Sequence, residues 1–192
     1  AYLINEKEFW KNVFYVDKNV LIPRPDTELL IEKILKIYSN KSQLQILDIG
    51  TGSGCIILSL LKERKKDYGT GIDISKKSIN VSKINAKLLN LSNRTKFFHS
   101  SIDNFNIGKY DLIVSNPPYI ELLNLKYLEK DVVNFEPKLA LNGGLDGFSK
   151  IKTVISKASS LLKKKGKLIL EIGFNQKDKV KEMLKKKGFY VN

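Results

Sequence analysis

One short segment combines residue types that could act on a planar NH2 group: Asn116-Pro117-Pro118-Tyr119. It follows residues 111–115, a mainly apolar stretch typical of a buried strand. Two prolines restrict the backbone after the asparagine, so the Asn116 side-chain oxygen and the Pro117 carbonyl would form a rigid pair of hydrogen-bond acceptors. Such acceptors bind the N–H groups of an amide or amine more tightly as positive charge develops on its nitrogen. Tyr119 could cover the flat face of the bound group, although a rigid strand-exit turn with Tyr119 in the core is the structural alternative.

A second segment that could bind a ligand is the loop from Asp48 to Gly54, which reads Asp-Ile-Gly-Thr-Gly-Ser-Gly. It lies between a predicted strand and a predicted helix, where glycines let the backbone turn sharply and approach a ligand closely. The glycines alone are a weak signal, because NAD, another nucleotide or a simple tight turn would also explain them. Asp73 favours a ligand that contains a nucleoside over a simple tight turn. It ends the next predicted strand, where an acid can accept both ribose hydroxyls of a nucleoside.

The aspartate, the spaced glycines and the later acid together resemble the class I methyltransferases. This resemblance implies a Rossmann-like α/β fold, with a mostly parallel twisted sheet and helices on both faces. It also implies S-adenosyl-L-methionine as cofactor, with S-adenosyl-L-homocysteine as product, so no nucleophilic side chain would be needed. Asp48 would lie near the methionine portion of the cofactor, a helix-capping acid being the structural alternative. The expected cofactor-binding residues are Asp48, Gly50, Thr51, Gly52, Ser53, Gly54, Asp73, Ile102 and Asn116.

The acceptor cannot be chosen from Asn116 to Tyr119 alone, because methyltransferases of adenine N6, guanine N2 and glutamine amides share these four residues. Two flanking stretches are more selective: Leu21 to Glu28, and Phe135 to Gly147 with its Gly-Gly-Leu-Asp-Gly end. Together with Glu6 to Trp10, they closely resemble the release-factor glutamine methyltransferases, the HemK/PrmC family, over essentially the whole chain. The joint pattern is far more specific than either half.

The family resemblance implies methylation of the side-chain amide nitrogen, N5, of the glutamine in the Gly-Gly-Gln motif of peptide chain release factors. Asn116, Pro117 and Tyr119 would then be catalytic, and these three with Pro118 would bind the glutamine. The chain departs from the family after its third predicted strand, where an acid and a large apolar residue usually lie near the adenine. Here the chain has Ser101-Ile102, with Asp103 further on, so Ile102 can still pack on the adenine while the polar contact is not assigned.

Two other functions compete with this interpretation. The net charge of +14, mostly from lysine, would suit a nucleic-acid methyltransferase acting on adenine N6 or guanine N2, but no added target-recognition segment is evident. A non-catalytic module that binds cofactor or a translation partner is the second alternative, and the complete set of reaction-site residues argues against it. We expect the lysines at 62–66, 163–165 and 185–187 to be solvated on helix ends and turns. Arg24 and Glu28 could equally contact the substrate or form an ion pair that holds the N-terminal hairpin.

Hydrophobic periodicity predicts alternating strands and helices behind a small hairpin, which indicates βαβ units and a parallel sheet. The hairpin is predicted over residues 8–22, turning at 17–19. Strands are expected at 45–48, 69–73, 96–99, 111–115 and 167–172, with a sixth opening at 189–191. Helices are expected at 26–38, 55–61, 75–91, 147–163 and 176–187. Their predicted apolar faces include Leu29, Leu30, Ile34 and Leu35 in the first helix, and Ile79, Val81, Ile84 and Leu88 in the third.

The 192 residues, 42% of them hydrophobic, fit one domain with a sizeable core. Residues 1–25 are expected to form a hairpin and linker that follow a helical domain outside this sequence. Residues 26–192 are expected to form the methyltransferase domain without its last strand. The single cysteine, Cys55, suits a reducing, cytoplasmic setting, and no apolar run is long enough to cross a membrane. The chain is expected to be a monomer. No metal cluster is evident, His99 is expected to be structural, and nucleic acid is expected only through the release factor or the ribosome.

Overall fold

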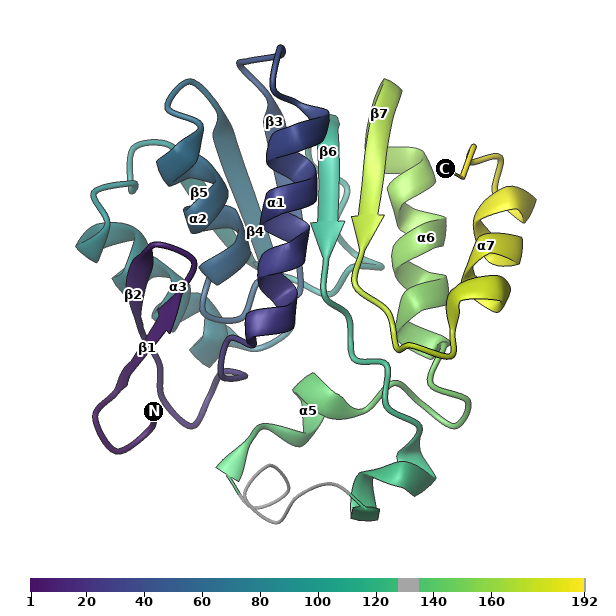
Figure 1. Ribbon diagram of the computed structural model, residues 1–192, viewed down its shortest axis with the longest axis horizontal. Helices are drawn as coiled ribbons and strands as arrows, with labels where there is room; N and C mark the ends of the chain where they lie inside the picture. Colours follow the sequence, from purple (N-terminus) through teal and green to yellow (C-terminus); the bar gives the residue numbers. More distant parts are fainter. Residues whose placement is uncertain (128–134, 192) are drawn as a thin grey trace.

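The computed structural model describes residues 1–127 and 135–191. Its central feature is a five-stranded parallel sheet in the order β5-β4-β3-β6-β7, which confirms the predicted α/β class. The strands are β3 (Gln45–Ile49), β4 (Tyr68–Asp73), β5 (Thr95–His99), β6 (Tyr110–Ser115) and β7 (Leu162–Leu170). The chain runs outward from β3 through β4 to β5, and then returns to the other side of β3 to form β6 and β7 (Figure 1). The switch point of this doubly wound sheet therefore lies between β3 and β6.

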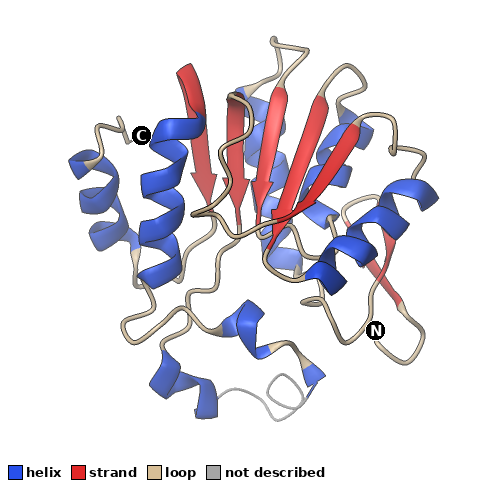
Figure 2. Cartoon of the chain, turned by 180° about the vertical axis from the view of Figure 1, so that it is seen from behind, coloured by secondary structure: helices blue, strands red, loops and turns tan. Residues whose placement is uncertain are grey.

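Helices cover both faces of the sheet. Alternate residues of β3 point to opposite faces, so Ile46 packs in the cluster with α1 and α2, while Leu47 packs in the cluster with α6. The helices are α1 (Glu28–Ile37), α2 (Cys55–Glu63), α3 (Lys76–Leu88), α5 (Lys138–Leu141), α6 (Ser149–Leu161) and α7 (Lys177–Lys186), with 3-10 turns η1 (Pro25–Thr27) and η2 (Leu122–Tyr127). Figure 2 shows all five strand arrows pointing toward one edge of the sheet, the edge that faces the segment with α5.

The N-terminal hairpin exists, but its predicted turn is wrong. Strand β1 (Glu6–Phe9) pairs antiparallel with β2 (Asn12–Tyr15), so the chain reverses at Trp10 and Lys11. Trp10 adopts the left-handed conformation, with φ of 54°, which sequence reasoning does not expect of a tryptophan. The packing of Phe9 against Phe14 in the core favours this turn, with ring centroids 6.1 Å apart. Residues 17–19 form a separate turn, in which the Asp17 carboxylate accepts a hydrogen bond from the Asn19 N–H.

Two predicted helix faces also need correction. In α1 the buried residues are Leu30, Ile31 and Ile34, whereas Leu29 is 58% exposed, because the helix is rotated relative to the predicted face. Helix α3 begins as predicted, since the Ser75 hydroxyl accepts a hydrogen bond from the Ser78 N–H, but it ends at Leu88 instead of residue 91. Ile84 and Leu88 are exposed. The polar residues Ser78, Ser82 and Asn85 are buried there beside Ile79, Val81 and Ala86.

Two features near the end of the chain differ from the prediction: the start of β7 (Leu162–Leu170) and the expected strand at 189–191. Strand β7 starts at Leu162, five residues before the predicted start, and crosses a register shift opposite β6 that includes Lys165 with φ of 65°. The lysines at 163–165 therefore lie on a strand and not on a helix end or turn. Residues 189–191 form no strand in the described chain; the turn at Gly188 ends α7, and Phe189 packs against the core instead.

Asn85 connects the hairpin to the rest of the domain. Its side chain is fully buried and accepts a hydrogen bond from the Tyr15 N–H at 2.7 Å. Its amide nitrogen donates to the Tyr15 carbonyl at 2.9 Å and to the Ser53 carbonyl in the glycine loop at 2.8 Å. One side chain of α3 thus ties β2 and the glycine loop together.

We expect Asn85→Ala to lower the free energy of unfolding by roughly 2–4 kcal/mol, because it leaves buried backbone groups of the hairpin and the loop without partners. Urea denaturation would measure the change. Lys87→Ala, on the exposed side of the same helix, is the matched control and should stay within about 0.5 kcal/mol of the wild type. Equal effects of the two substitutions would contradict the role of Asn85.

Candidate active site

The sheet register brings the glycine loop after β3 and the segment that begins at Asn116 after β6 to the same edge of the sheet. Ile49 pairs with Ile72 of β4 on one side and with Ser115 of β6 on the other. The residues that follow these three, Gly50, Asp73 and Asn116, therefore leave the sheet together at its carboxyl edge. The Ser115 hydroxyl donates to the Ile49 carbonyl at 2.7 Å, which joins the two strand ends at the switch point.

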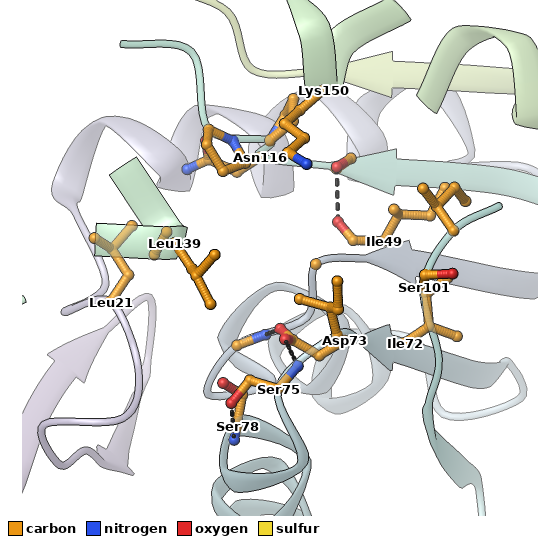
Figure 3. Close-up of a pocket in the computed structure, with 18 of the residues that line it drawn as sticks. Leu21, Ile49, Ile72, Asp73, Ser75, Ser78, Ser101, Asn116, Leu139 and Lys150 are labelled. Atoms are coloured by element: carbon orange, nitrogen blue, oxygen red, sulfur yellow. Dashed lines mark hydrogen bonds between the residues drawn. The ribbon is translucent and has the colours of Figure 1, made fainter. Parts of the chain in front are cut away.

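A cavity of about 270 Å³ opens at this edge (Figure 3). Of the predicted site residues, seven line it: Gly50, Gly52, Asp73, Ile102, Asn116, Pro117 and Pro118. Asp48, Thr51, Ser53, Gly54 and Tyr119 do not belong to its lining. In Figure 3, Asp73 and Asn116 approach the cavity from different strands, and Leu21 and Leu139 close it from the side of the linker and α5.

The glycine loop keeps one wall of the cavity open. Gly50 has φ of 74°, and a Cβ placed on it would have no atom within 4 Å, so the space above this backbone is free. The N–H groups of Gly50 and Thr51 both donate to the Ile72 carbonyl at 2.9 Å. These bonds hold the loop against β4 and leave its outer surface to a ligand that needs close backbone approach.

The Asp73 carboxylate lies at the end of β4 on the cavity wall. One oxygen accepts a hydrogen bond from the Gly52 N–H at 3.0 Å and the other accepts one from the Ser75 N–H at 2.8 Å. Burial raises the pKa of Asp73, while these backbone hydrogen bonds lower it. Each carboxylate oxygen can still accept a further hydrogen bond, as the binding of two ribose hydroxyls would require.

Asp48 lies behind the glycine loop and is completely buried. Its Oδ2 accepts a hydrogen bond from the Thr51 hydroxyl at 2.7 Å, while Oδ1 has no partner among the described residues. Burial raises the pKa of Asp48 to about 7, and the Thr51 hydrogen bond opposes that shift. A buried carboxylate oxygen without a partner is costly, so it is suited to receive a cationic group from a ligand.

Asn116 and Pro117 present two unused acceptors. The Asn116 Nδ2 donates to the Thr27 hydroxyl at 3.1 Å, which fixes one side of the amide. Among the described residues, no protein donor bonds to Asn116 Oδ1 or to the Pro117 carbonyl. Tyr119 packs instead against the cluster formed by α6 and α7, as the structural alternative for this residue supposed.

The Gly-Gly-Leu-Asp-Gly segment supports the acceptor residues through its backbone. A Cβ on Gly143 would lie 2.8 Å from the Tyr119 carbonyl carbon, and one on Gly147 would lie 2.7 Å from the Tyr119 oxygen. The Gln176 amide donates to the carbonyls of Tyr119, at 3.2 Å, and Gly147, at 3.1 Å. The glycines are therefore needed for close contact with the segment that follows Asn116.

Several lining residues were missed by the sequence analysis because they lie far apart in the chain. They come from the turn after the hairpin, from α3, from the segment after β5, from α5 and from α6: Asn19, Val20, Leu21, Ser78, Ser100, Leu139, Ala140, Lys150, Thr153 and Val154. The Arg24–Glu28 ion pair considered above does not form. Arg24 bonds to the buried Glu136 at 2.7 Å, and Glu28 accepts a hydrogen bond from the Trp10 N–H.

Comparison with known proteins identifies the family. Residues 40–192 match the family described as "Methyltransferase domain". The chain is 42% identical to the release factor glutamine methyltransferase of Buchnera aphidicola subsp. Baizongia pistaciae, over 98% of this chain and 68% of that protein. The chain belongs to the release factor glutamine methyltransferase family. It is also 37% identical to the Caulobacter vibrioides member, covering 98% of this chain and 65% of that protein. A bifunctional methyltransferase of Rickettsia bellii is 37% identical, and this chain spans 39% of its length.

Solved structures agree on the fold of this family member. The ribosomal protein L11 methylase of Lactobacillus delbrueckii subsp. bulgaricus superposes with a TM-score of 0.66 at 22% identity, covering 92% of this chain and 76% of that one. An S-adenosylmethionine-dependent methyltransferase of Geobacter sulfurreducens, solved with S-adenosyl-L-homocysteine, gives a TM-score of 0.50 at 16% identity over 77% of this chain and 47% of that one. These structures confirm the predicted fold. The family membership confirms the predicted enzyme class and its cofactor.

The residues at the cavity fit S-adenosyl-L-methionine. The open backbone at Gly50, the hydrogen-bonding capacity of Asp73 and the apolar side chain of Ile102 suit its methionine, ribose and adenine portions respectively. The unpartnered oxygen of Asp48 suits its ammonium group. Among residues 1–127 and 135–191, no cluster of His, Cys, Asp or Glu could hold a metal ion. No helix described in this chain is long and apolar enough to span a membrane.

The raised pKa of Asp48 predicts a pH-dependent stability. Asp48 holds its proton up to about pH 7 in the folded chain, whereas an unfolded aspartate releases it near pH 4, so folding stability falls as pH rises through this window. Asp48→Asn cannot ionise and escapes this loss. We expect the stability of Asp48→Asn relative to wild type to increase by on the order of 2–3 kcal/mol between pH 5 and pH 8.

Urea denaturation at the two pH values would measure this difference. Asp178→Asn, on the exposed surface of α7, is the control and should give the same difference from wild type at both. A relative stability of Asp48→Asn that does not change with pH would contradict an ionisation of Asp48 near neutral pH.

Proposed function

We propose that this chain transfers a methyl group from S-adenosyl-L-methionine to the side-chain amide nitrogen, N5, of the glutamine in the Gly-Gly-Gln motif of a peptide chain release factor. One observation carries the proposal: the register of β3, β4 and β6 places Gly50, Asp73 and Asn116 around one cavity. A cofactor site and a pair of amide acceptors thus meet at a single edge of the sheet. The family membership supports the choice of glutamine.

In the proposed cofactor site, the carboxylate of Asp73 holds the ribose, and Gly50 and Gly52 approach the methionine portion with their backbones. The Thr51 hydroxyl holds Oδ2 of the buried Asp48, and Oδ1, which has no partner in the described chain, would accept the cofactor amino group. Ile102 would pack on the adenine. Bound S-adenosyl-L-methionine supplies an electrophilic methyl group, which explains why a nucleophilic side chain is unnecessary.

In the proposed acceptor site, Asn116 Oδ1 and the Pro117 carbonyl accept the two N–H groups of the glutamine amide. The lone pair of an amide nitrogen is delocalised into its carbonyl, so the nitrogen is a poor nucleophile. Acceptors on both N–H bonds stabilise the nitrogen as it becomes tetrahedral and positively charged, which lowers the barrier more than it strengthens substrate binding. Pro117 and Pro118 hold the acceptors in place before the substrate arrives.

The walls of the cavity favour a desolvated reaction. Leu21 and Leu139 line the side of the cavity toward the linker and α5 (Figure 3). Pro117 and Pro118 belong to its lining as well. Once cofactor and glutamine fill the cavity, apolar side chains at these positions would exclude water, so the hydrogen bonds to Asn116 and Pro117 would act in a region of low dielectric constant. Tyr119 would contribute through the edge of its ring or its backbone, since its side chain packs toward α6 and α7.

The proposed partner is the release factor itself, presented as a folded protein with its glutamine in an accessible loop. A translation factor as substrate places the reaction in the cytoplasm, and we propose that the chain acts as a monomer. Nucleic acid would be met only through the release factor or the ribosome. Because the chain spans 68% of the Buchnera relative and 39% of the Rickettsia bifunctional methyltransferase, the activity of a longer parent protein is part of this proposal.

We expect Asn116→Ala to reduce kcat for methyl transfer to intact release factor by roughly 100- to 1000-fold, because one of the two acceptors on the reacting nitrogen is lost. Transfer of a labelled methyl group, followed by peptide mapping of the glutamine, would measure this. Asn40→Ala, in the exposed turn after α1, is the matched control and should keep wild-type turnover.

The same assay should include RNA and DNA as acceptors. Labelling of nucleic acid without labelling of the release factor would refute the proposed substrate and favour the adenine N6 or guanine N2 alternative. Binding of cofactor without transfer to any acceptor would favour a non-catalytic module. Wild-type turnover by Asn116→Ala would refute the role given to this residue.

A further inference from the structure

The side chain of Asn116 is held by a residue from a distant part of the chain. Its Nδ2 donates to the hydroxyl of Thr27 at 3.1 Å, across a sequence separation of 89 residues. Thr27 is the last residue of η1 and is 3% exposed, so water competes little for this hydrogen bond. The contact lies on the side of the amide that the proposed substrate does not use.

Glu171 approaches the same group from the neighbouring strand. Leu170 of β7 pairs with Ser115 of β6, so Glu171 and Asn116 leave the sheet side by side. The Glu171 N–H donates to the Ser115 carbonyl at 3.0 Å, and Glu171 Oε2 is buried without a partner in the described part of the chain. The strand register puts Glu171 next to Asn116. Burial raises the pKa of the Glu171 carboxyl, while hydrogen bonding from Thr27, Asn116 and Tyr119 lowers it.

The orientation of the Asn116 amide decides whether the site can work. An asparagine amide has nearly the same shape when its oxygen and nitrogen are exchanged, but the exchanged form would present N–H groups to the N–H groups of the substrate. A carboxylate can only accept hydrogen bonds, and the Thr27 hydroxyl can accept one from Nδ2 while it donates its own proton to that carboxylate. Both neighbours therefore favour Nδ2 on their side of Asn116.

We propose that Thr27 and Glu171 are positioning residues that fix the orientation of the Asn116 amide, so that its Oδ1 faces the cavity and the acceptor nitrogen. This inference rests on the proposed function, because it assigns Asn116 Oδ1 as an acceptor for the glutamine amide. Neither residue touches the substrate in this arrangement. Both act through Asn116, from η1 on one side and from the end of β7 on the other.

Thr27→Val is the direct test, because valine keeps the shape of threonine and removes its hydroxyl. We expect kcat for methyl transfer to intact release factor to fall by roughly 10- to 100-fold, as expected when one hydrogen bond that preorganises a reaction site is lost. The KM for release factor should change less than about threefold, since substrate binding depends on the whole contact surface. Thr27→Ser restores the hydroxyl and should recover most of the wild-type kcat.

A threonine outside the site provides the matched control. The Thr95 hydroxyl, at the opposite end of the sheet, donates to the Leu91 carbonyl at 3.0 Å. Thr95→Val therefore removes a hydroxyl with a comparable hydrogen bond, and it should leave kcat unchanged. Urea denaturation of each variant would show that the altered kcat of Thr27→Val does not come from unfolding.

Glu171 is tested by its coupling to Thr27. Glu171→Leu removes the acceptor and should lower kcat in the same direction as Thr27→Val, while Glu171→Gln keeps an acceptor oxygen and should lower it less. Because both residues act on one amide, the double variant Thr27→Val/Glu171→Leu should lose less than the product of the two single losses. Independent, multiplicative losses would overturn the shared role.

A second readout does not depend on activity. In protein labelled with 15N-asparagine, the Asn116 side-chain NH2 signal, assigned by its loss in Asn116→Ala, should show slow hydrogen exchange in the wild type and in Thr27→Ser. In Thr27→Val it should exchange at least about tenfold faster, because its protective hydrogen bond is gone.

The outcomes separate the inference from the proposed function. If wild-type protein fails to methylate release factor, the proposed function fails, and the exchange measurement still decides whether Thr27 holds the amide. If the wild type is active but Thr27→Val keeps its kcat, or Thr27→Ser is impaired as much as Thr27→Val, the inference is overturned while the proposed function stands.

Discussion

The parallel pairing of β3 with β6 is the constraint on which the site depends. These two strands meet at the switch point, and one carries the glycine loop while the other carries the acceptor segment. The hydrogen bond from Ser115 to the Ile49 carbonyl joins their ends inside the core. A slip of one residue would turn every side chain to the opposite face, so the register is strongly specified. The separation between the glycine loop and Asn116 is consequently decided by backbone hydrogen bonds and not by mobile side chains.

Buried polar groups surround this constraint and hold the loops at the edge of the sheet. Asn85 ties the glycine loop to the hairpin, and Gln176 ties the acceptor segment to the loop before α6. Arg24 reaches the buried Glu136 across 112 residues, which joins the linker to the segment before α5. Asp48, like Glu136, keeps one buried oxygen without a partner in the described chain. Such a group lowers stability in the free protein and is suited to binding, a common conflict at functional sites.

The sequence predicts what is local and misses what depends on long-range packing. The apolar runs and glycines locate β3, β4 and β6 closely. The loops after β3 and β6 contain five of the seven cavity residues foreseen, Asp73 ends β4, and Ile102 follows β5. The turn at Trp10 was missed because its left-handed conformation is unfavourable locally and depends on tertiary packing. The contact of Thr27 with Asn116 and that of Arg24 with Glu136 join segments with no shared sequence signal. Tyr119 packs partly against the cluster of α6 and α7, and its expected contact with the substrate stays a prediction.

The close approach of Gly143 and Gly147 to the backbone of Tyr119 has a consequence for how the enzyme can be retargeted. Any side chain at these two positions would displace the acceptor segment, so we expect substitutions of these glycines to impair the site. Leu139, which lines the cavity, is 71% exposed, so the rim of the cavity is open to substitution. Directed evolution toward a different polypeptide could therefore sample the rim freely. Such variants would keep the geometry of methyl transfer, while the protein substrate that they accept could change.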